Sequence, residues 1–352
     1  MTRTIVKRST AYWLCSSFLL VLAILSSCSK DADLLILRFI QPSNFPAPVY
    51  DLSKNPISND KFILGRTLFY DPILSRNNTI SCGNCHQQEG AFCHIDHNVS
   101  HGIDDKVGTR NSPALQNLAF YKSFMWDGGI FDLDLQPIAP IENHVEMDEK
   151  LETVIPKLQA SSKYRSLFKK AYGSETVNTV GLLKALSQFM LLMVSADSKY
   201  DKYVRGEAGG TFTDDEKEGL TLFNAKCRSC HSTDLFTDQN FRNNGLKPSA
   251  VNDSGRYKIT LHPDDMYKFK VPSLRNVALT APYMHDGRFK TLEQVLDHYR
   301  TGVVVSTTLD PLLNNGSLPG IAITDLEKQK IILFLKTLTD ESFTKDKRFA
   351  EQ

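Results

Sequence analysis

The sequence predicts a mainly α-helical chain built from two tandem units with long loops. The pattern Cys-x-x-Cys-His occurs twice, at 82–86 and at 227–231, once in each half of the chain. Apolar residues recur at helical spacing, most clearly over 176–196. Long stretches such as 232–269 hold few strand signals. These observations favour a helical protein whose two halves carry the same kind of site.

The composition fits two domains of ordinary size. The chain has 352 residues, of which 41% are hydrophobic, so each half is able to bury a core of its own. The formal net charge is +1. A charge this close to zero indicates neither a nucleic-acid partner nor a strongly acidic one.

The repeated pattern is the attachment signal of c-type haem. Two thiols bond to the porphyrin, and the adjoining histidine supplies the proximal nitrogen to iron. A redox-active Cys-x-x-Cys or half of a zinc site is the alternative, but no further cysteine pair is present to complete a zinc site. We therefore expect two covalently bound haem c groups. Their ligands would be Cys82, Cys85 and His86 in the first copy and Cys227, Cys230 and His231 in the second.

The chain begins with an export signal. A basic segment precedes an apolar run over 11–25, which is short for a membrane span. The run ends in Leu-Ser-Ser-Cys, which resembles the lipobox of bacterial lipoproteins. We predict a lipoprotein signal peptide over 1–27 and a tether over 28–57 that is lipidated at Cys28; an ordinary signal peptide cut nearby is the alternative. We expect a cell-envelope protein, facing the periplasm or on the outer membrane, with its lipid as the only membrane contact.

We assign 58–205 to an N-terminal domain that opens with a helix near 60–69. The polar loop 87–110 follows the first haem motif and contains three histidines. Each of them could reach the open face of the first haem, and each is also an ordinary surface histidine. These residues are His94, His97 and His101. Cys93, in the same loop, remains as a buried or idle free thiol.

Gln136 and Glu146 are the candidate catalytic groups of this domain. Near a haem iron, a carboxylate can move a proton between the two oxygens of peroxide, and an amide can orient it. In the alternative, which the residues alone favour, Glu146 caps a helix over 148–159 and Gln136 is a surface residue. Further helices are expected over 162–172 and 176–196.

The C-terminal domain, 206–352, follows a glycine-rich boundary at 198–210. Three capping boxes start its helices, at Thr213, Thr291 and Thr324.

The second haem needs another axial ligand after His231, because electron-transfer haems are usually six-coordinate. The candidates are Met284, His285, His298 and Tyr299. Cytochromes c commonly use methionine, so the residues alone favour Met284. Tyr299 lies on the apolar stripe of a helix and could equally be a core residue that packs on Val295.

The residues resemble the bacterial di-haem cytochrome c peroxidase family, which includes the MauG-type enzymes. The resemblance covers nearly the whole mature chain. It implies two tandem cytochrome-c-like domains, with a peroxidatic haem in the first and an electron-transfer haem in the second. It rests on both haem motifs, Arg110-Asn111-Ser112-Pro113, Trp126-Asp127-Gly128, the spacing of Gln136, Pro140 and Glu146, Leu274-Arg275-Asn276 and Pro282-Tyr283-Met284-His285-Asp286-Gly287.

The resemblance implies roles for single residues around the first haem. His86 would be its proximal ligand, and Gln136 and Glu146 would line its distal pocket. Trp126 falls where the family places a tryptophan between the haems. His101 falls close to a distal histidine that some peroxidases move on and off the iron, with one residue missing from the loop before it.

The resemblance also implies an interdomain calcium ion, and it changes the expected ligand of the second haem. The calcium positions correspond to Asn111, Thr280 and Pro282, the last two through backbone carbonyls. Where other peroxidases of the family have an axial methionine, this sequence has Tyr299, as in the MauG-type enzymes. This favours Tyr299 over Met284. A phenolate stabilises ferric iron and should lower the potential of this haem.

We therefore predict a peroxidase that reduces hydrogen peroxide to water with electrons from a cytochrome c or another small redox protein. The second hypothesis is a MauG-like oxidase of a protein or a small organic molecule. The third is a non-enzymatic di-haem electron carrier. A homodimer is compatible with the sequence.

Overall fold

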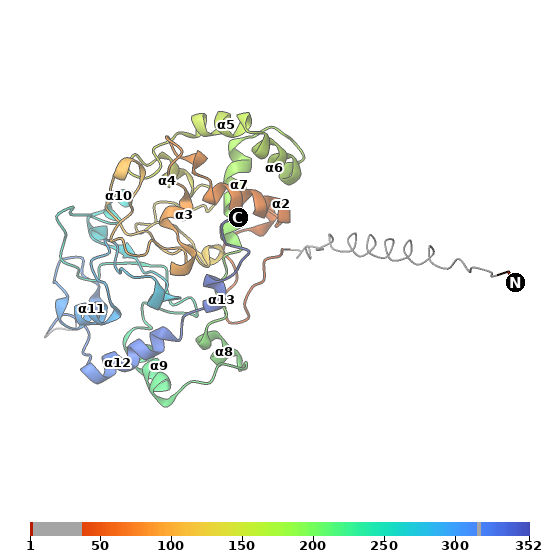
Figure 1. Cartoon of the computed structure of the whole chain (residues 1–352). Helices are drawn as coiled ribbons and strands as arrows, with labels where there is room; N and C mark the ends of the chain where they lie inside the picture. Colours follow the sequence, from red (N-terminus) through yellow and green to blue (C-terminus); the bar gives the residue numbers. More distant parts are fainter. Residues whose placement is uncertain (3–36, 315–317) are drawn as a thin grey trace. The chain divides into compact units, whose positions relative to one another are not determined.

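The computed structural model describes residues 1–2, 37–314 and 318–352. Contacts divide the chain into a unit that ends at Leu37 and a compact unit, Arg38–Gln352 (Figure 1). Most of the predicted signal peptide, the lipidation site Cys28 and the start of the predicted tether lie outside the described residues. Among the described residues, no helix is both long and apolar enough to cross a membrane.

The described chain is mainly helical, as predicted (Figure 1). The α-helices are α2 (Asn59–Tyr70), α3 (Cys82–Cys85), α4 (Ile138–Glu142), α5 (Leu151–Ala160), α6 (Ser162–Tyr172), α7 (Thr179–Leu191), α8 (Lys199–Arg205), α9 (Asp214–Lys226), α10 (Tyr257–Thr260), α11 (Leu292–Asp297), α12 (Asp325–Lys336) and α13 (Glu341–Thr344). The short 3-10 turns are Leu52–Lys54, Pro72–Leu74, Gln88–Gly90, Ile103–Asp105, Leu118–Phe120, Pro263–Asp265, Val277–Leu279 and Pro311–Leu313, and a π-helical turn spans His298–Gly302. Strands β1 (Phe241–Arg242) and β2 (Phe269–Lys270) pair antiparallel, with Phe241 opposite Lys270.

Local hydrogen bonds explain where the helices begin. At Thr213, Thr291 and Thr324, each hydroxyl accepts a bond from the backbone N–H three residues on, so the predicted capping boxes are confirmed. The helix predicted over 176–196 is shorter in the structure, because the Asn178 side chain caps α7 at its first turn.

Each half contains a helix that precedes its haem motif and packs on a later helix (Figure 1). Helix α2 meets α7 at Gly65, where an added Cβ would lie 1.9 Å from the carbonyl oxygen of Ala185. Helix α9 meets α12 at Gly219, where an added Cβ would lie 2.1 Å from the carbonyl oxygen of Lys330. Glycine is needed at both crossings because the backbones approach too closely for a side chain. The two halves therefore use the same type of helix packing.

A second repeat, which was not among the sequence predictions, also relates the two halves. The first copy reads Pro-Ala-Leu-Gln-Asn-Leu-Ala-Phe at 113–120 and Phe-Met-Trp-Asp-Gly at 124–128; the second reads Pro-Ser-Leu-Arg-Asn-Val-Ala-Leu at 272–279 and Tyr-Met-His-Asp-Gly at 283–287. Matched residues share a left-handed backbone conformation, which residues other than glycine seldom adopt. These residues are Asn117 and Met125 in the first copy and Asn276 and Met284 in the second.

The two copies of this repeat meet and exchange matched hydrogen bonds. The backbone N–H of Asn111 donates to the carbonyl oxygen of His285 at 2.7 Å. In return, the backbone N–H of Lys270 donates to the carbonyl oxygen of Trp126, also at 2.7 Å. Because the donors and the acceptors occupy equivalent places in the two copies, the junction between the halves is approximately two-fold symmetric.

The packing of the chain differs from the predicted limits at 58–205 and 206–352. Helix α8 falls within the predicted N-terminal domain, but its Tyr200 packs on Phe236 and Phe334 of the C-terminal half. The end of the chain lies beside α2 and α7 of the N-terminal half (Figure 1). Gly206, near the predicted boundary, ends helix α8. A glycine that ends a helix does not determine whether the apolar side chains of that helix pack in the N-terminal or the C-terminal core.

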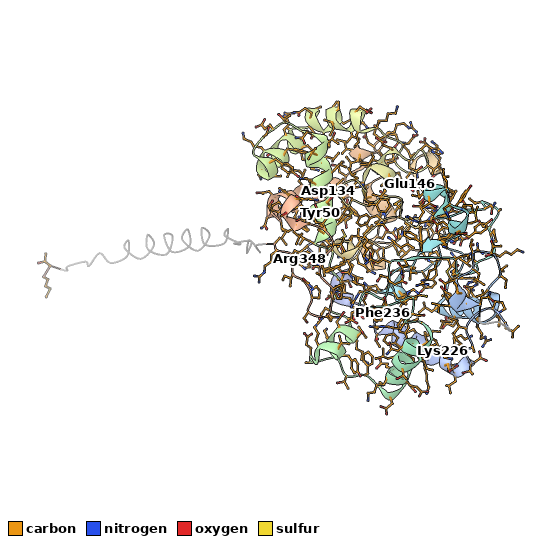
Figure 2. The ribbon with its side chains drawn as sticks, turned by 180° about the vertical axis from the view of Figure 1, so that it is seen from behind. Tyr50, Asp134, Glu146, Lys226, Phe236 and Arg348 are labelled. Carbon is orange, nitrogen blue, oxygen red and sulfur yellow. The ribbon has the colours of Figure 1, made fainter. Side chains whose placement is uncertain are left out.

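The described part of the predicted tether, residues 38–57, lies on the folded body. Phe45 is buried, and the backbone N–H groups of Val49 and Tyr50 donate to the carbonyl oxygen of Ala119 at 2.9 and 3.0 Å. The Tyr50 hydroxyl donates to Asp134 at 2.9 Å (Figure 2). This segment is therefore an ordered part of the fold.

Candidate functional site

The first haem motif lies on a single helical turn, α3. Ser81 and Asn84 bond reciprocally as a capping box, which fixes where the turn begins. The ring Nδ1 of His86 lies 2.7 Å from the carbonyl oxygen of Phe92. Nδ1–H therefore donates to this carbonyl, and Nε2 keeps its lone pair for iron. Burial lowers the pKa of His86 to about 4, so the ring is neutral, as a metal ligand must be.

The second motif repeats this arrangement. The ring Nδ1 of His231 lies 3.0 Å from the carbonyl oxygen of Phe236, and burial lowers the pKa of this histidine as well. Phe92 and Phe236 both have left-handed backbones, with φ of 62° and 55°. Each loop thus turns its carbonyl back toward its own histidine. The structure holds both predicted proximal ligands in the same way.

A cavity of about 660 Å³ lies beside the second motif. Its size is within the usual range for cofactor sites. Cys227, Cys230 and His231 line one wall, and apolar side chains of α11 and α12, such as Leu296 and Ile331, line others. These residues fit a haem, because the attaching thiols and the proximal histidine border a space with largely apolar walls.

Two of the four candidate axial ligands, Tyr299 and Met284, contact the side-chain amide of the same residue, Asn244. Tyr299 and Met284 both line the cavity. The side-chain amide of Asn244 donates to the Met284 Sδ at 3.5 Å. Burial raises the pKa of Tyr299 to about 12, and a hydrogen bond with the Asn244 side chain partly offsets this rise. Tyr299 as the axial ligand stays a prediction, with Met284 beside it.

The two candidate histidines each make a close contact with another group. His298 is buried, and its Nε2 lies 3.0 Å from the carbonyl oxygen of Asn244. His285 lines the cavity, but its ring stacks on Phe269 with centroids 3.8 Å apart.

Glu146 lies close to the first motif. Burial raises the pKa of Cys85 to about 11, and the negative charge of Glu146 adds to that rise. Burial also raises the pKa of Glu146 itself, while hydrogen bonds from Ser100 and Asn143 oppose the rise. Helix α5 begins after Lys150, so Glu146 does not cap it. The alternative prediction, in which Glu146 is a helix cap, is therefore wrong.

The other predicted catalytic residues, Gln136 and Trp126, each donate a side-chain hydrogen bond. The Gln136 side-chain amide donates to the Met125 Sδ at 3.9 Å. The Trp126 indole N–H donates to the carbonyl oxygen of Asn111 at 2.8 Å, and Trp126 lines the cavity at the second motif. Trp126 therefore lies at the junction where the two repeats exchange hydrogen bonds.

The three histidines of the loop after the first motif form a stack. The ring centroids are 4.1 Å apart between His94 and His97 and 5.5 Å apart between His97 and His101. The Cys85 thiol lies 3.5 Å from the carbonyl oxygen of His101, so this loop rests against the first motif. Within the described residues, the Nδ1 of His94 is the buried side-chain polar atom without a hydrogen-bond partner.

The three predicted calcium ligands border the same cavity. Asn111, Thr280 and Pro282 all line it, and the Asn111 amide N–H donates to the carbonyl oxygen of Asn98 at 3.1 Å. That bond uses the amide nitrogen, so the amide oxygen of Asn111 is the side-chain atom that would bind a cation. Among the described residues, no group of three or more His, Cys, Asp or Glu side chains is arranged to hold a metal ion. Calcium binding stays a prediction based on neutral oxygen donors.

Comparisons with known proteins agree with this arrangement. The family model for di-haem cytochrome c peroxidase matches residues 59–209. The chain is 34% identical to the methylamine utilization protein MauG of Methylorubrum extorquens, over 89% of this chain and 86% of that protein. It is 33% identical to the cytochrome c551 peroxidase of Nitrosomonas europaea, over 81% of this chain and 82% of that protein.

Solved structures show the same relationship. A MauG-like protein associated with microbial copper homeostasis is 34% identical, with a TM-score of 0.81, over 89% of this chain and 99% of that one. The di-haem peroxidase BthA of Burkholderia thailandensis shares the fold, with a TM-score of 0.73 at 21% identity, over 90% of this chain and 96% of that one. The chain belongs to the di-haem cytochrome c peroxidase family. Membership implies two haem c groups, for which the chain has its two motifs.

Three residues at these sites were absent from the sequence predictions. Asn244 contacts two candidate ligands through its amide, and Phe92 and Phe236 hold the proximal histidines through their carbonyls. The second repeat relates Met284 to Met125, and in the structure both sulfur atoms accept a side-chain amide N–H, from Asn244 and Gln136 respectively. Every residue has a backbone carbonyl, so the residue types in the sequence do not reveal which carbonyls hold the two histidines.

Proposed function

We propose that this protein is a peroxidase that reduces hydrogen peroxide to two molecules of water, with two electrons and two protons. A haem held by His86 would supply the redox iron at which peroxide binds and its O–O bond breaks. The observation that carries the proposal is the partly buried carboxyl group of Glu146 beside this motif. A carboxyl group at this place supplies the proton transfer that the reaction needs.

Glu146 would act as both base and acid. Its carboxylate can take the proton from the peroxide oxygen nearer the iron and deliver it to the farther oxygen, which then leaves as water. Because burial raises its pKa, Glu146 holds a proton more strongly than an exposed glutamate does. The Ser100 hydroxyl lies 3.4 Å from its Oε1 and orients the carboxyl group. Gln136 would orient peroxide from its place beside Met125.

Electrons would enter through the second motif and cross the junction near Trp126. The junction supports this route, because the Trp126 carbonyl accepts the N–H of Lys270 and its indole N–H donates to Asn111. The donor would be a cytochrome c or another small redox protein, in line with the relatives named cytochrome c551 peroxidase.

We further propose that a lipid at Cys28 holds the protein in the cell envelope, with the catalytic unit facing the periplasm. This proposal rests on the lipobox-like sequence, and it agrees with the attachment of c-type haem outside the cytoplasm. One calcium ion would bind at Asn111, Thr280 and Pro282, which border one cavity. Radiolabelled lipid incorporation, with Cys28→Ser as the control, tests the anchor.

Glu146→Gln tests the peroxidase. This change keeps the size of the side chain and removes its ability to exchange a proton, so peroxide turnover should fall at least 100-fold, as expected for loss of general acid–base catalysis. Glu142→Gln, an exposed position on α4, is the matched control. Haem content and spectra should match wild type in both variants. Undiminished turnover in Glu146→Gln would contradict the assignment.

A MauG-like oxidase is the second candidate. Tyr299 in the cavity of the second motif favours it, because a phenolate ligand stabilises oxidised iron, and relatives named MauG match most of the chain. In this case the reducing equivalents would come from a protein or small organic substrate. Rapid peroxide-dependent oxidation of reduced cytochrome c would count against this candidate.

A ferric spectrum without high-spin haem and without a response to peroxide would instead indicate an electron carrier.

A further inference from the structure

The carbonyl groups that hold the two proximal histidines belong to residues in an unfavourable backbone conformation. Phe92 and Phe236 have φ of 62° and 55°, in the left-handed region that residues with a side chain seldom adopt. Both side chains are fully buried. The groups that pack on these two rings therefore help to keep each carbonyl aimed at its histidine.

Helix α12 packs on the ring of the second loop. The ring of Phe334, which is fully buried in α12, lies 6.0 Å from the ring of Phe236. Phe223 of α9 lies 5.7 Å from Phe236 on the same core. The loop that holds His231 is thus supported by helices of its own half.

The chain that follows α12 packs on the ring of the first loop. After Asp340 it crosses to the N-terminal half and ends beside α2 and α7 (Figure 1). Phe343 and Phe349 lie 5.7 and 6.4 Å from the ring of Phe92. The side-chain amide of Gln88, in the same loop as Phe92, donates to two carbonyl oxygens of the tail, at 2.8 and 3.3 Å.

This C-terminal tail, residues 340–352, is tied down at both ends. Asp340 is buried, and its backbone N–H donates to the side chain of Asn276 at 2.7 Å. At the far end, the Tyr70 hydroxyl of α2 donates to the carbonyl oxygen of Phe349 at 2.7 Å. Arg348, labelled in Figure 2, also offers its carbonyl oxygen to a side chain of α2, at 2.9 Å. The tail is therefore a defined part of the structure around the first motif.

We propose that α12 and the C-terminal tail, which are consecutive in the chain, are positioning elements, α12 for the second haem and the tail for the first. Phe334 supports the loop that holds His231, and Phe349 supports the loop that holds His86. The tail touches no reacting atom. It acts through the hydrogen bond from His86 to Phe92, which sets the basicity of the proximal nitrogen and so the properties of the iron.

The first experiment compares Phe349→Ala with Phe168→Ala in the haem-loaded protein. Phe168 is likewise buried, and its ring packs on that of Tyr172 within α6. The midpoint potential of each haem and the iron–histidine vibration of the reduced first haem are measured. Phe349→Ala should shift both properties of the first haem and leave the second haem unchanged. Phe168→Ala should shift neither haem.

Two further variants separate positioning from loss of stability. Gln88→Leu removes the bonds to the tail carbonyls without removing a buried ring, and it should shift the first haem in the same direction. Phe334→Leu, which keeps an apolar side chain in the core, should shift the second haem alone. Limited proteolysis at Lys345 and Lys347 reports release of the tail.

The inference is overturned if Phe349→Ala releases the tail to protease but leaves the first haem unchanged. Equal shifts in Phe168→Ala would overturn it as well, because they would show a general effect of core loss. These measurements use a chemical reductant and need neither peroxide nor the physiological electron donor. They therefore test the tail even if the protein turns out to have another substrate.

Discussion

Arg275 and Asp201 form a fully buried ion pair that joins α8 to the C-terminal half. The two terminal nitrogens of Arg275 lie 2.8 and 2.5 Å from the carboxylate oxygens, and both side chains are 0% exposed. Arg275 also lines the cavity of the second motif. Removing one partner of such a pair leaves a buried charge and costs about 3–5 kcal/mol of unfolding free energy.

The remaining contacts indicate which partner is the costlier to remove. Without Arg275, Asp201 keeps the N–H and hydroxyl of Ser198, the amide of Asn44 and the guanidinium of Arg205, 4.0 Å away. Without the carboxylate, the Arg275 guanidinium keeps the backbone carbonyl of Asp234 at 2.9 Å. We therefore expect Arg275→Met to cost about 3 kcal/mol and Asp201→Asn to cost about 5 kcal/mol.

Urea unfolding of the haem-loaded protein measures these costs. The far-ultraviolet circular dichroism and the haem absorbance should both be followed, for the two single variants and the double variant. Because each single change strands the other group, the double variant should lose less than the sum of the two losses. Losses below about 1 kcal/mol in both single variants, or strictly additive losses, would refute the reasoning.

Three further predictions follow from other contacts. Because the folded pKa of Glu146 is raised, this group stabilises the protein below the pKa of an ordinary glutamate and loses that contribution as pH rises through the folded pKa. Glu146→Gln should therefore unfold at higher urea concentration than wild type at pH 7, and equal midpoints would contradict the burial. Tyr299→Phe should change the low-spin signal in the electron paramagnetic resonance spectrum and no other signal, whereas Met284→Leu should leave the spectrum unchanged. If Met284→Leu changes the low-spin signal and Tyr299→Phe does not, Met284 is the ligand. Gly219→Ala should lower the unfolding free energy by about 1–3 kcal/mol, because its Cβ would strike the Lys330 carbonyl, and an unchanged thermal midpoint would show that the helices move apart freely.

The sequence by itself determined the features that depend on neighbours along the chain. The capping boxes at Thr213, Thr291 and Thr324 involve residues three positions apart, so their hydrogen bonds could be predicted from the residue types. The haem motifs are equally local, because thiols and histidine lie within five consecutive residues. Helical spacing placed α5 and α6 nearly where they occur.

Only the tertiary structure decided the features that join distant parts of the chain. From the residues alone, a helix cap was the favoured role of Glu146; its place near Cys85 depends on the loop around Ser100, which contacts it. Tyr200 and Phe349 each pack in the half opposite to the one that their position in the chain suggests. An apolar side chain gains about the same free energy from any core that it can reach. Which core that is depends on the path of the folded backbone.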